Sequence, residues 1–230
     1  MNSAEKTTVL VLPGMDGTGE LLTSFASQMS THRRVQVIAY PVDRPLGYDD
    51  LVNFVIERAP HEQFVVLGES FSGPIAIEVA AIDKRVVGLI LASSFARHPM
   101  PALFAPIASI VDISWVPSSL IAVALLGSAG TPELKARLNR VLARLPRQII
   151  HARASEVLRV DKRNRLREIQ CPVLCLQGRF DRLVRKKHLN EITSIQPRCQ
   201  VRWLDAPHML LESQPDAAVE AINQFCGQFD

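Results

Sequence analysis

Six short apolar runs recur along the chain, and each has the length of a β-strand rather than of a helix. Their apolar character is nearly continuous, which is typical of strands that are covered on both faces in a parallel sheet. The predicted strands span residues 7–12, 35–40, 64–67, 87–92, 173–177 and 201–204.

Between these runs, apolar residues recur with the spacing of helices that bury one face. One stripe lies in residues 21–29 and a second in 51–56, while residues 74–81 are almost wholly apolar. The alternation of strand and helix predicts an α/β fold. We expect a mostly parallel, six-stranded, doubly wound sheet with helices on both faces.

One interval breaks this alternation, because 80 residues separate the fourth predicted strand from the fifth. It contains a predicted helix with Thr131 as N-cap and Pro132 at the first position. The apolar face of this helix is formed by Leu134, Leu138, Val141, Leu142 and Leu145. We predict that residues 93–172 form an inserted helical cap, with one core crossover helix, and that 1–92 and 173–230 form the core.

The composition is that of a folded chain with a hydrophobic core, since 47% of the 230 residues are hydrophobic and 21% are charged. The first apolar run is too short for a signal-peptide core, and no run approaches the about 20 apolar residues of a membrane span. The four cysteines lack metal-ligand spacing. We therefore expect core thiols, no metal, no membrane span and a cytoplasmic location.

Candidate chemistry begins where the third predicted strand ends, at Gly68-Glu69-Ser70-Phe71-Ser72. Small residues two places before and after Ser70 suit a chain that bends so sharply that these positions nearly touch. This is the pattern of a nucleophile elbow, a strained strand-to-helix turn that exposes a serine hydroxyl.

A nucleophilic serine needs a base and a group that orients the base, and elbow enzymes carry the acid and then the histidine further along the chain. His208 follows the last predicted strand and Asp181 follows the one before it. Asp205 is the alternative acid, although its position at a strand end also suits a turn. We predict that His98 contacts the pocket, and that the other histidines lie on the surface: His32, His61, His151 and His188.

The same chemistry needs backbone donors for a developing oxyanion. We assign these to the N–H of Phe71, directly after the nucleophile, and the N–H of Met15 in the glycine-rich loop after the first strand. That loop has the order G-x-x-G-x-G and no Gly-Lys-Ser/Thr, so it does not match a nucleotide-binding motif, and no cofactor is expected.

These motifs resemble those of the α/β-hydrolase superfamily over most of the chain. The matching segments are L-P-G-M-D-G at 12–17, G-E-S-F-S-G at 68–73, Q-G-R-F-D at 177–181 and A-P-H at 206–208. Pro13-Gly14 stands where the family often has His-Gly, and Ser72 replaces a glycine. The chain begins at what would be the family's third strand. The resemblance implies hydrolysis of an acyl bond by an enzyme with a serine nucleophile.

The predicted cap suggests a substrate class. Phe104, Ile107 and Trp115 are expected to form pocket walls for an acyl chain. Residues 131–170 hold eleven Lys or Arg and four Asp or Glu, with a stripe of Arg137, Arg140 and Arg144. Such charge is usually a solvated helix face, but it also suits an acidic partner. The layout is similar to the pimeloyl-ACP methyl ester esterases, whose basic cap helices face an acidic acyl carrier protein.

The sequence therefore favours a serine hydrolase that cleaves a small carboxylic ester or thioester, with nucleic acid excluded as a partner because aromatics are few and the rest of the chain is net negative. Two alternatives stay open. One is a non-catalytic, receptor-like protein that binds a small ligand in the same pocket, and the other is an acyltransferase that uses the same serine.

Overall fold

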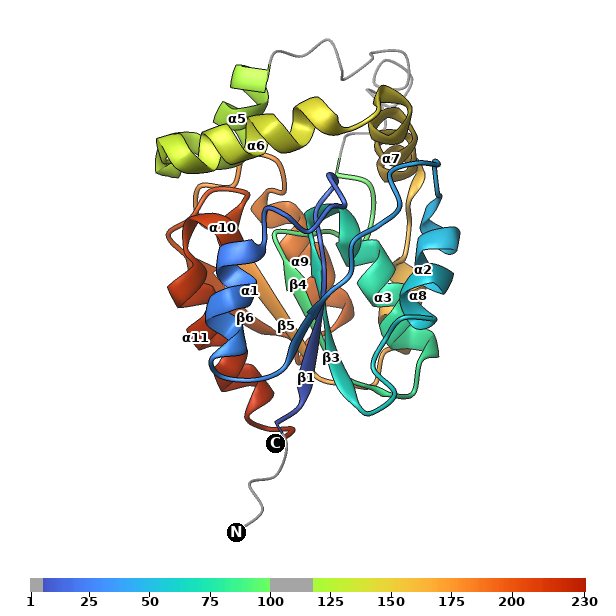
Figure 1. Cartoon of the computed structure of the whole chain (residues 1–230). Coiled ribbons are helices and arrows are strands. Elements are labelled where there is room, and N and C mark those ends of the chain that lie inside the picture. The colour runs from blue at the N-terminus through green and yellow to red at the C-terminus, as the bar shows by residue number, and fades with distance from the viewer. Residues whose placement is uncertain (1–5, 100–117) are drawn as a thin grey trace.

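The computed structural model describes residues 6–99 and 118–230. Its centre is one six-stranded sheet in which every pair of neighbours is parallel, in the order β2-β1-β3-β4-β5-β6 (Figure 1). The strands are β1 (Thr8–Leu12), β2 (Val35–Val37), β3 (Phe64–Glu69), β4 (Val86–Ala92), β5 (Val173–Gly178) and β6 (Gln200–Leu204). All six predicted strands and the parallel sheet are confirmed.

The second strand is shorter than predicted, because the chain leaves the sheet before Tyr40. The backbone N–H of Tyr40 donates to Gly17 O at 2.7 Å, and its ring is buried in the core. Ile38 and Tyr40 are therefore buried outside the edge strand, whereas Ala39 is exposed. The apolar run predicts the burial of Ile38 and Tyr40 correctly and the length of the strand wrongly.

Helices cover both faces of the sheet, as predicted. On one face lie α1 (Thr23–Ser30), α10 (Leu210–Ser213) and α11 (Pro215–Cys226), and on the other lie α2 (Tyr48–Ile56), α3 (Gly73–Ile82), α8 (Arg163–Glu168) and α9 (Lys186–Ile195) (Figure 1). Helix α3 follows the central strand and is buried along most of its length, which explains why residues 74–81 lack a polar face.

A further set of helices lies over the carboxyl edge of the sheet (Figure 1). It consists of α5 (Ser118–Leu126), α6 (Pro132–Arg144) and α7 (Arg147–Arg159). Thr131 caps α6 by accepting a hydrogen bond from the N–H of Leu134 at 3.2 Å, and the predicted leucine face of α6 packs against Leu21 and Met209 of the core. The predicted helix is thus confirmed, while the division into core and cap domains stays a prediction.

Candidate active site

The turn between β3 and α3 has the geometry that its sequence predicted. Ser70 has a φ of +46°, a left-handed conformation that is uncommon for a residue with a side chain. A Cβ atom on Gly68 would lie 2.5 Å from Ser72 O, and one on Gly73 would lie 1.8 Å from Ser94 Oγ. The elbow therefore closes only because the flanking positions are small.

The structure brings Ser70, His208 and Asp181 into one hydrogen-bonded chain. Ser70 Oγ lies 2.7 Å from His208 Nε2, and His208 Nδ1 lies 2.9 Å from Asp181 Oδ2. Because an ionised carboxylate only accepts, the proton of the neutral imidazole resides on Nδ1, and Nε2 is left to accept from the serine hydroxyl. The arrangement can remove a proton from Ser70.

The carboxylate of Asp181 is held rigidly by its own loop. Its Oδ1 accepts the backbone N–H groups of Leu183 and Val184, both at 2.9 Å, and its side chain is fully buried. The alternative acid, Asp205, instead forms an ion pair with Arg179 at 2.9 Å, and 78% of its side chain is exposed. The geometry favours Asp181 as the partner of the histidine.

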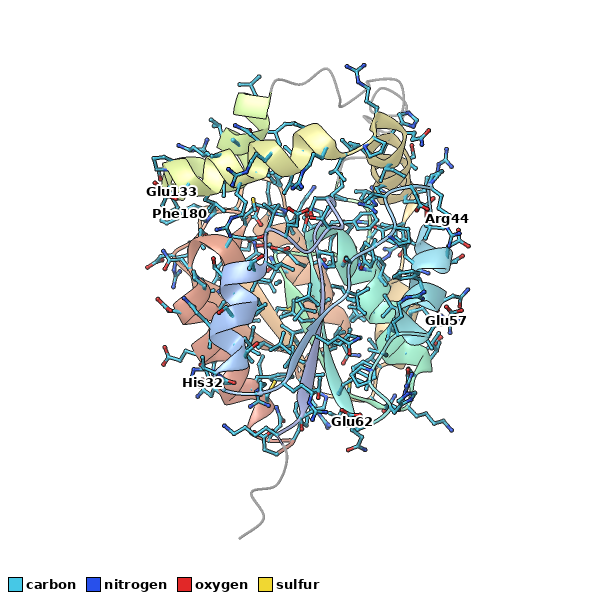
Figure 2. All side chains as sticks on the ribbon, in the orientation of Figure 1. His32, Arg44, Glu57, Glu62, Glu133 and Phe180 are labelled. Carbon is cyan, nitrogen blue, oxygen red and sulfur yellow. The ribbon has the colours of Figure 1, made fainter. Side chains whose placement is uncertain are left out.

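Among the other histidines, one prediction is wrong. His188 is buried, not on the surface, because it lies on the inner face of α9 beside Leu189. Burial, together with nearby positive charge, lowers its pKa to about 4. Figure 2 shows His32 low on the molecule, whereas Phe180, next to Asp181, lies higher up, below α6.

Both predicted oxyanion donors lie in tightly held backbone. In the loop after β1, Gly17 N–H donates to Gly14 O at 3.0 Å and closes a turn around Met15. Beside the elbow, the Tyr48 hydroxyl donates to Phe71 O at 3.0 Å, and the two rings stack with centroids 4.9 Å apart. The oxyanion roles of Met15 and Phe71 stay predictions.

Further side chains tie the elbow to its surroundings. Ser94 Oγ donates to Ser70 O at 2.6 Å. The Ser72 hydroxyl donates to Pro13 O and lies 2.7 Å from the hydroxyl of Tyr40, so the elbow is joined to the loop after β1. Sequence reasoning did not find Tyr40, Tyr48 or Ser94, because each comes from a different element and none belongs to a motif.

A buried acidic pair lies directly behind the site. The carboxyls of Glu69 and Glu212 are hydrogen-bond neighbours, and burial raises the pKa of both, that of Glu212 to about 7. Glu212 Oε2 is buried and accepts no N–H or hydroxyl proton from the described residues. Two adjacent buried carboxyls are best satisfied by sharing one proton.

Several sequence predictions fall outside the constellation. Phe104, Ile107 and Trp115 lie outside the described residues. In the basic stripe, Arg144 forms an ion pair with Glu20 at 2.5 Å and Arg137 donates to Ser24 Oγ at 3.4 Å. Two of the three stripe arginines thus contact α1 and its preceding loop. The stripe is therefore not a purely solvent-exposed helix face.

Neither a metal centre nor a membrane-spanning helix is found in the described part of the chain. No group of three or more His, Cys, Asp or Glu side chains there is arranged to hold a metal ion. Within residues 6–99 and 118–230, none of the helices has the length and apolar character needed to cross a membrane. All four cysteines are free thiols.

The chain matches one protein family and is similar to several solved structures. Residues 7–222 match the family model described as the Alpha/beta hydrolase family. No curated protein matches the chain. Among solved structures, the chain is similar to an enol-lactonase from Burkholderia xenovorans LB400, at 14% identity and a TM-score of 0.85, over 99% of this chain and 94% of the lactonase.

Two more solved structures show the same fold. A hydrolase from Pseudomonas aeruginosa PA01 has 20% identity and a TM-score of 0.82, over 99% of this chain and 92% of that hydrolase. A thermophilic esterase from Thermogutta terrifontis has 21% identity and a TM-score of 0.78, over 97% of this chain and 90% of the esterase.

Proposed function

The chain belongs to the alpha/beta hydrolase family, and we propose that it is a serine hydrolase that cleaves a carboxylic ester or thioester through an acyl-enzyme. The observation that carries this proposal is the continuous chain from Ser70 Oγ through His208 to Asp181, with separations of 2.7 and 2.9 Å. A receptor-like protein has no need for a base aimed at a strained serine.

In the first half-reaction, His208 Nε2 takes the hydroxyl proton while Ser70 Oγ attacks the acyl carbon. Asp181 orients the ring and stabilises the imidazolium that forms. The negative charge that develops on the carbonyl oxygen is met by the N–H groups of Phe71 and Met15. Collapse of the adduct transfers the proton from His208 to the leaving alcohol or thiol, and Ser70 remains acylated.

In the second half-reaction, His208 takes a proton from water, and the resulting hydroxyl attacks the acyl-enzyme. The carboxylic acid leaves and Ser70 recovers its proton from the imidazolium. If an alcohol rather than water were the acceptor, the same steps would give acyl transfer. The neighbours described as esterase and lactonase support hydrolysis of an ester bond.

The proposed substrate carries an acyl chain, because the sequence around residues 99–126 is rich in apolar residues that are expected to line the pocket. Each methylene buried there contributes about 0.8 kcal/mol, which is roughly a fourfold gain in kcat/KM. An acidic carrier protein is proposed as the vehicle of the substrate, on the basis of the positive charge of residues 131–170.

A panel of p-nitrophenyl esters of graded chain length tests this proposal, with Ser70→Ala and the exposed Ser30→Ala as matched variants. We expect kcat/KM to rise with chain length up to a limit, Ser30→Ala to match wild type, and Ser70→Ala to lose nearly all turnover while staying folded. Product analysis in the presence of a short alcohol separates hydrolysis from acyl transfer. A fully active Ser70→Ala protein would contradict the proposal.

A further inference from the structure

A guanidinium group from the cap helices is buried beside the loop that carries Met15. Arg153 projects from α7, and 3% of the residue is exposed. Its Nη1 donates to Met15 O at 2.9 Å and to Asp16 O at 2.6 Å, and its Nη2 donates to Pro41 O at 3.1 Å. The guanidinium carbon lies 5.7 Å from the centroid of the Tyr40 ring.

Within the described part of the chain, no carboxylate lies within ion-pair distance of this guanidinium. The nearby Asp16 carboxylate acts on it electrostatically at longer range, and itself accepts from the N–H and hydroxyl of Thr18 at 2.9 and 2.6 Å. Burying a charge without a direct ionic partner is costly unless hydrogen bonds compensate for it. For Arg153, the compensating hydrogen bonds go to three backbone carbonyls, and two of these belong to adjacent residues in the loop after β1.

The hydrogen bonds to Met15 O and Asp16 O restrain the turn between Gly14 and Gly17. Gly14 O accepts Gly17 N–H at 3.0 Å, and this carbonyl belongs to the same planar peptide unit as Met15 N–H. The next two peptide carbonyls, Met15 O and Asp16 O, are held by Arg153. Three successive peptide units therefore have a fixed orientation, and Met15 N–H must point away from the Gly14 carbonyl.

Gly17 shows how closely the guanidinium approaches the loop. Its φ is +70°, and a Cβ atom there would lie 2.3 Å from Arg153 Nη1. A side chain at this position would displace the guanidinium as well as strain the backbone. The loop sequence is thus matched to a side chain that arrives from a helix 136 residues further along the chain.

The same helix reaches the other side of the site. Glu156, one turn along α7, accepts Tyr48 N–H at 2.9 Å through its Oε2. Tyr48 in turn holds the carbonyl of Phe71 and stacks on its ring. Helix α7 therefore contacts the Met15 loop directly and the Phe71 backbone through Tyr48.

We propose that Arg153 is a positioning residue for catalysis: from α7 it fixes the peptide units around Met15, so that the Met15 N–H is pre-oriented toward the oxyanion. The proposal rests on the hydrolase function proposed above. It makes the placement of a cap helix part of transition-state stabilisation, because Arg153 holds the backbone around the Met15 donor and does not itself touch the reacting atoms.

The experiment compares Arg153→Met, Arg153→Lys and a control on the same helix, the exposed Arg159→Met. Steady-state kinetics with p-nitrophenyl butyrate give kcat and KM separately. An alkyl trifluoromethyl ketone adds reversibly to the serine and forms an adduct that carries an oxyanion. Its inhibition constant therefore reports how well the enzyme stabilises the charge of that oxyanion. Thermal unfolding of each variant reports stability.

We expect Arg153→Met to lower kcat by about 10- to 100-fold, somewhat less than loss of a whole oxyanion donor, with KM changed by less than about threefold. The inhibition constant of the ketone should rise in parallel with the loss of kcat/KM. Arg153→Lys should be intermediate, because an ammonium cannot reproduce the planar fork that contacts three carbonyls. Arg159→Met should match wild type.

Two results would overturn the inference. The first is a folded Arg153→Met protein with wild-type kcat and ketone affinity, even if it melts earlier, because the role would then be structural only. The second is an equal loss in Arg159→Met. If Arg153→Met fails to fold, Arg153→Lys tests the inference through the same two quantities, the change in kcat and the change in the inhibition constant of the ketone. A wild-type protein that neither cleaves the ester nor binds the ketone refutes the proposed function as well.

Discussion

Two aspartates compete for the role of orienting acid, and they stand in opposite surroundings. Asp181 is buried, accepts two backbone N–H groups and contacts His208, whereas Asp205 is exposed and paired with Arg179. We expect Asp181→Asn to lower kcat by about 10²- to 10⁴-fold, since the ring loses its orientation and the charge that stabilises the imidazolium.

Asp205→Asn serves as the matched control and should keep kcat within about twofold, because an exposed ion pair contributes little. Steady-state kinetics on the two variants decide between the acids. The reverse order, with Asp205→Asn inactive and Asp181→Asn active, would move the assignment to Asp205.

The buried pair of Glu69 and Glu212 predicts how stability depends on pH. Burial raises the pKa of Glu212 to about 7 in the folded protein, whereas an unfolded glutamate titrates near about 4.3. The folded state therefore binds more protons in this range, and its free energy of unfolding decreases as the pH rises from about 4 through about 7. At pH 8 the stabilising contribution of the proton on Glu212 has been lost.

Glu212→Gln removes this ionisation while it keeps a group that can donate to Glu69. We expect the melting temperature of the variant, relative to wild type, to increase steadily between pH 4.5 and pH 8. The exposed Glu220→Gln provides the control and should follow wild type at every pH. Parallel melting curves for wild type and Glu212→Gln across this range would refute the shared-proton account.

The residues that the sequence revealed are those that follow strands. Ser70, Asp181 and His208 each come just after a strand, so a parallel sheet brings them to one edge without any knowledge of side-chain packing. Arg153 and Tyr48 had no comparable signal. One lies in an ordinary amphipathic helix and the other begins a helix, and their partners are backbone atoms far away in sequence.

At the scale of elements, helix α6 is held to the core by one apolar face. Leu138 is 1% exposed and belongs to the cluster with Met209, the residue next to His208. We expect Leu138→Ala to cost about 2–5 kcal/mol of stability, which is the usual range for a leucine deletion in a packed core. Because the cavity opens beside the His208 loop, kcat should fall as well.

Denaturant unfolding and ester kinetics measure both effects. Leu142→Ala, on the same helix but only partly buried, is the control and should lose clearly less stability. If Leu138→Ala is as stable as wild type, α6 does not depend on this face for its attachment.

The limits of element prediction lie where tertiary contacts override local patterns. The predicted strand 35–40 ends at Val37, because Tyr40 is needed beneath the loop after β1. The polar neighbours of His188 predict a surface position, but the helical period places it on the inner face of α9. By contrast, α6 was predicted from its cap to its leucine face, since Thr131, Pro132 and the stripe all act within one helix.

At the scale of the whole molecule, much of the positive charge of residues 131–170 is neutralised by acids of the core. Glu78 pairs with Lys162 and Arg165, both at 2.9 Å, and Glu20 pairs with Arg144. The charge available to an acidic partner is therefore smaller than the sequence count of +7 indicates. Arg140, exposed on α6, is the stripe residue that best tests such a partner.

We expect Arg140→Glu to reduce kcat/KM for an ester carried on an acyl carrier protein, more strongly at low salt, and to leave p-nitrophenyl butyrate turnover unchanged. The control is Arg34→Glu, at an exposed position directly before β2 and away from α6. Equal activity of wild type and Arg140→Glu on the carrier-linked ester would mean that the stripe is a solvated helix face.

The parallel sheet, the two helical layers and the edge that carries the site all follow from strand periodicity and the direction of parallel strands. The connection between cap and site does not, because it depends on which side chains of α7 reach the loop after β1. The wall residues Phe104, Ile107 and Trp115 lie outside the described part of the chain, so the acyl-chain pocket stays a prediction.

The central claim is that Ser70 is an activated nucleophile, and covalent labelling tests it most directly. Wild-type protein would be treated with a fluorophosphonate, and the product examined by intact mass and by peptide mapping. The account predicts one label per chain on Ser70, no label on Ser70→Ala, and much slower labelling of His208→Ala. A label on Ser72, or a wild-type protein that does not react, would contradict it.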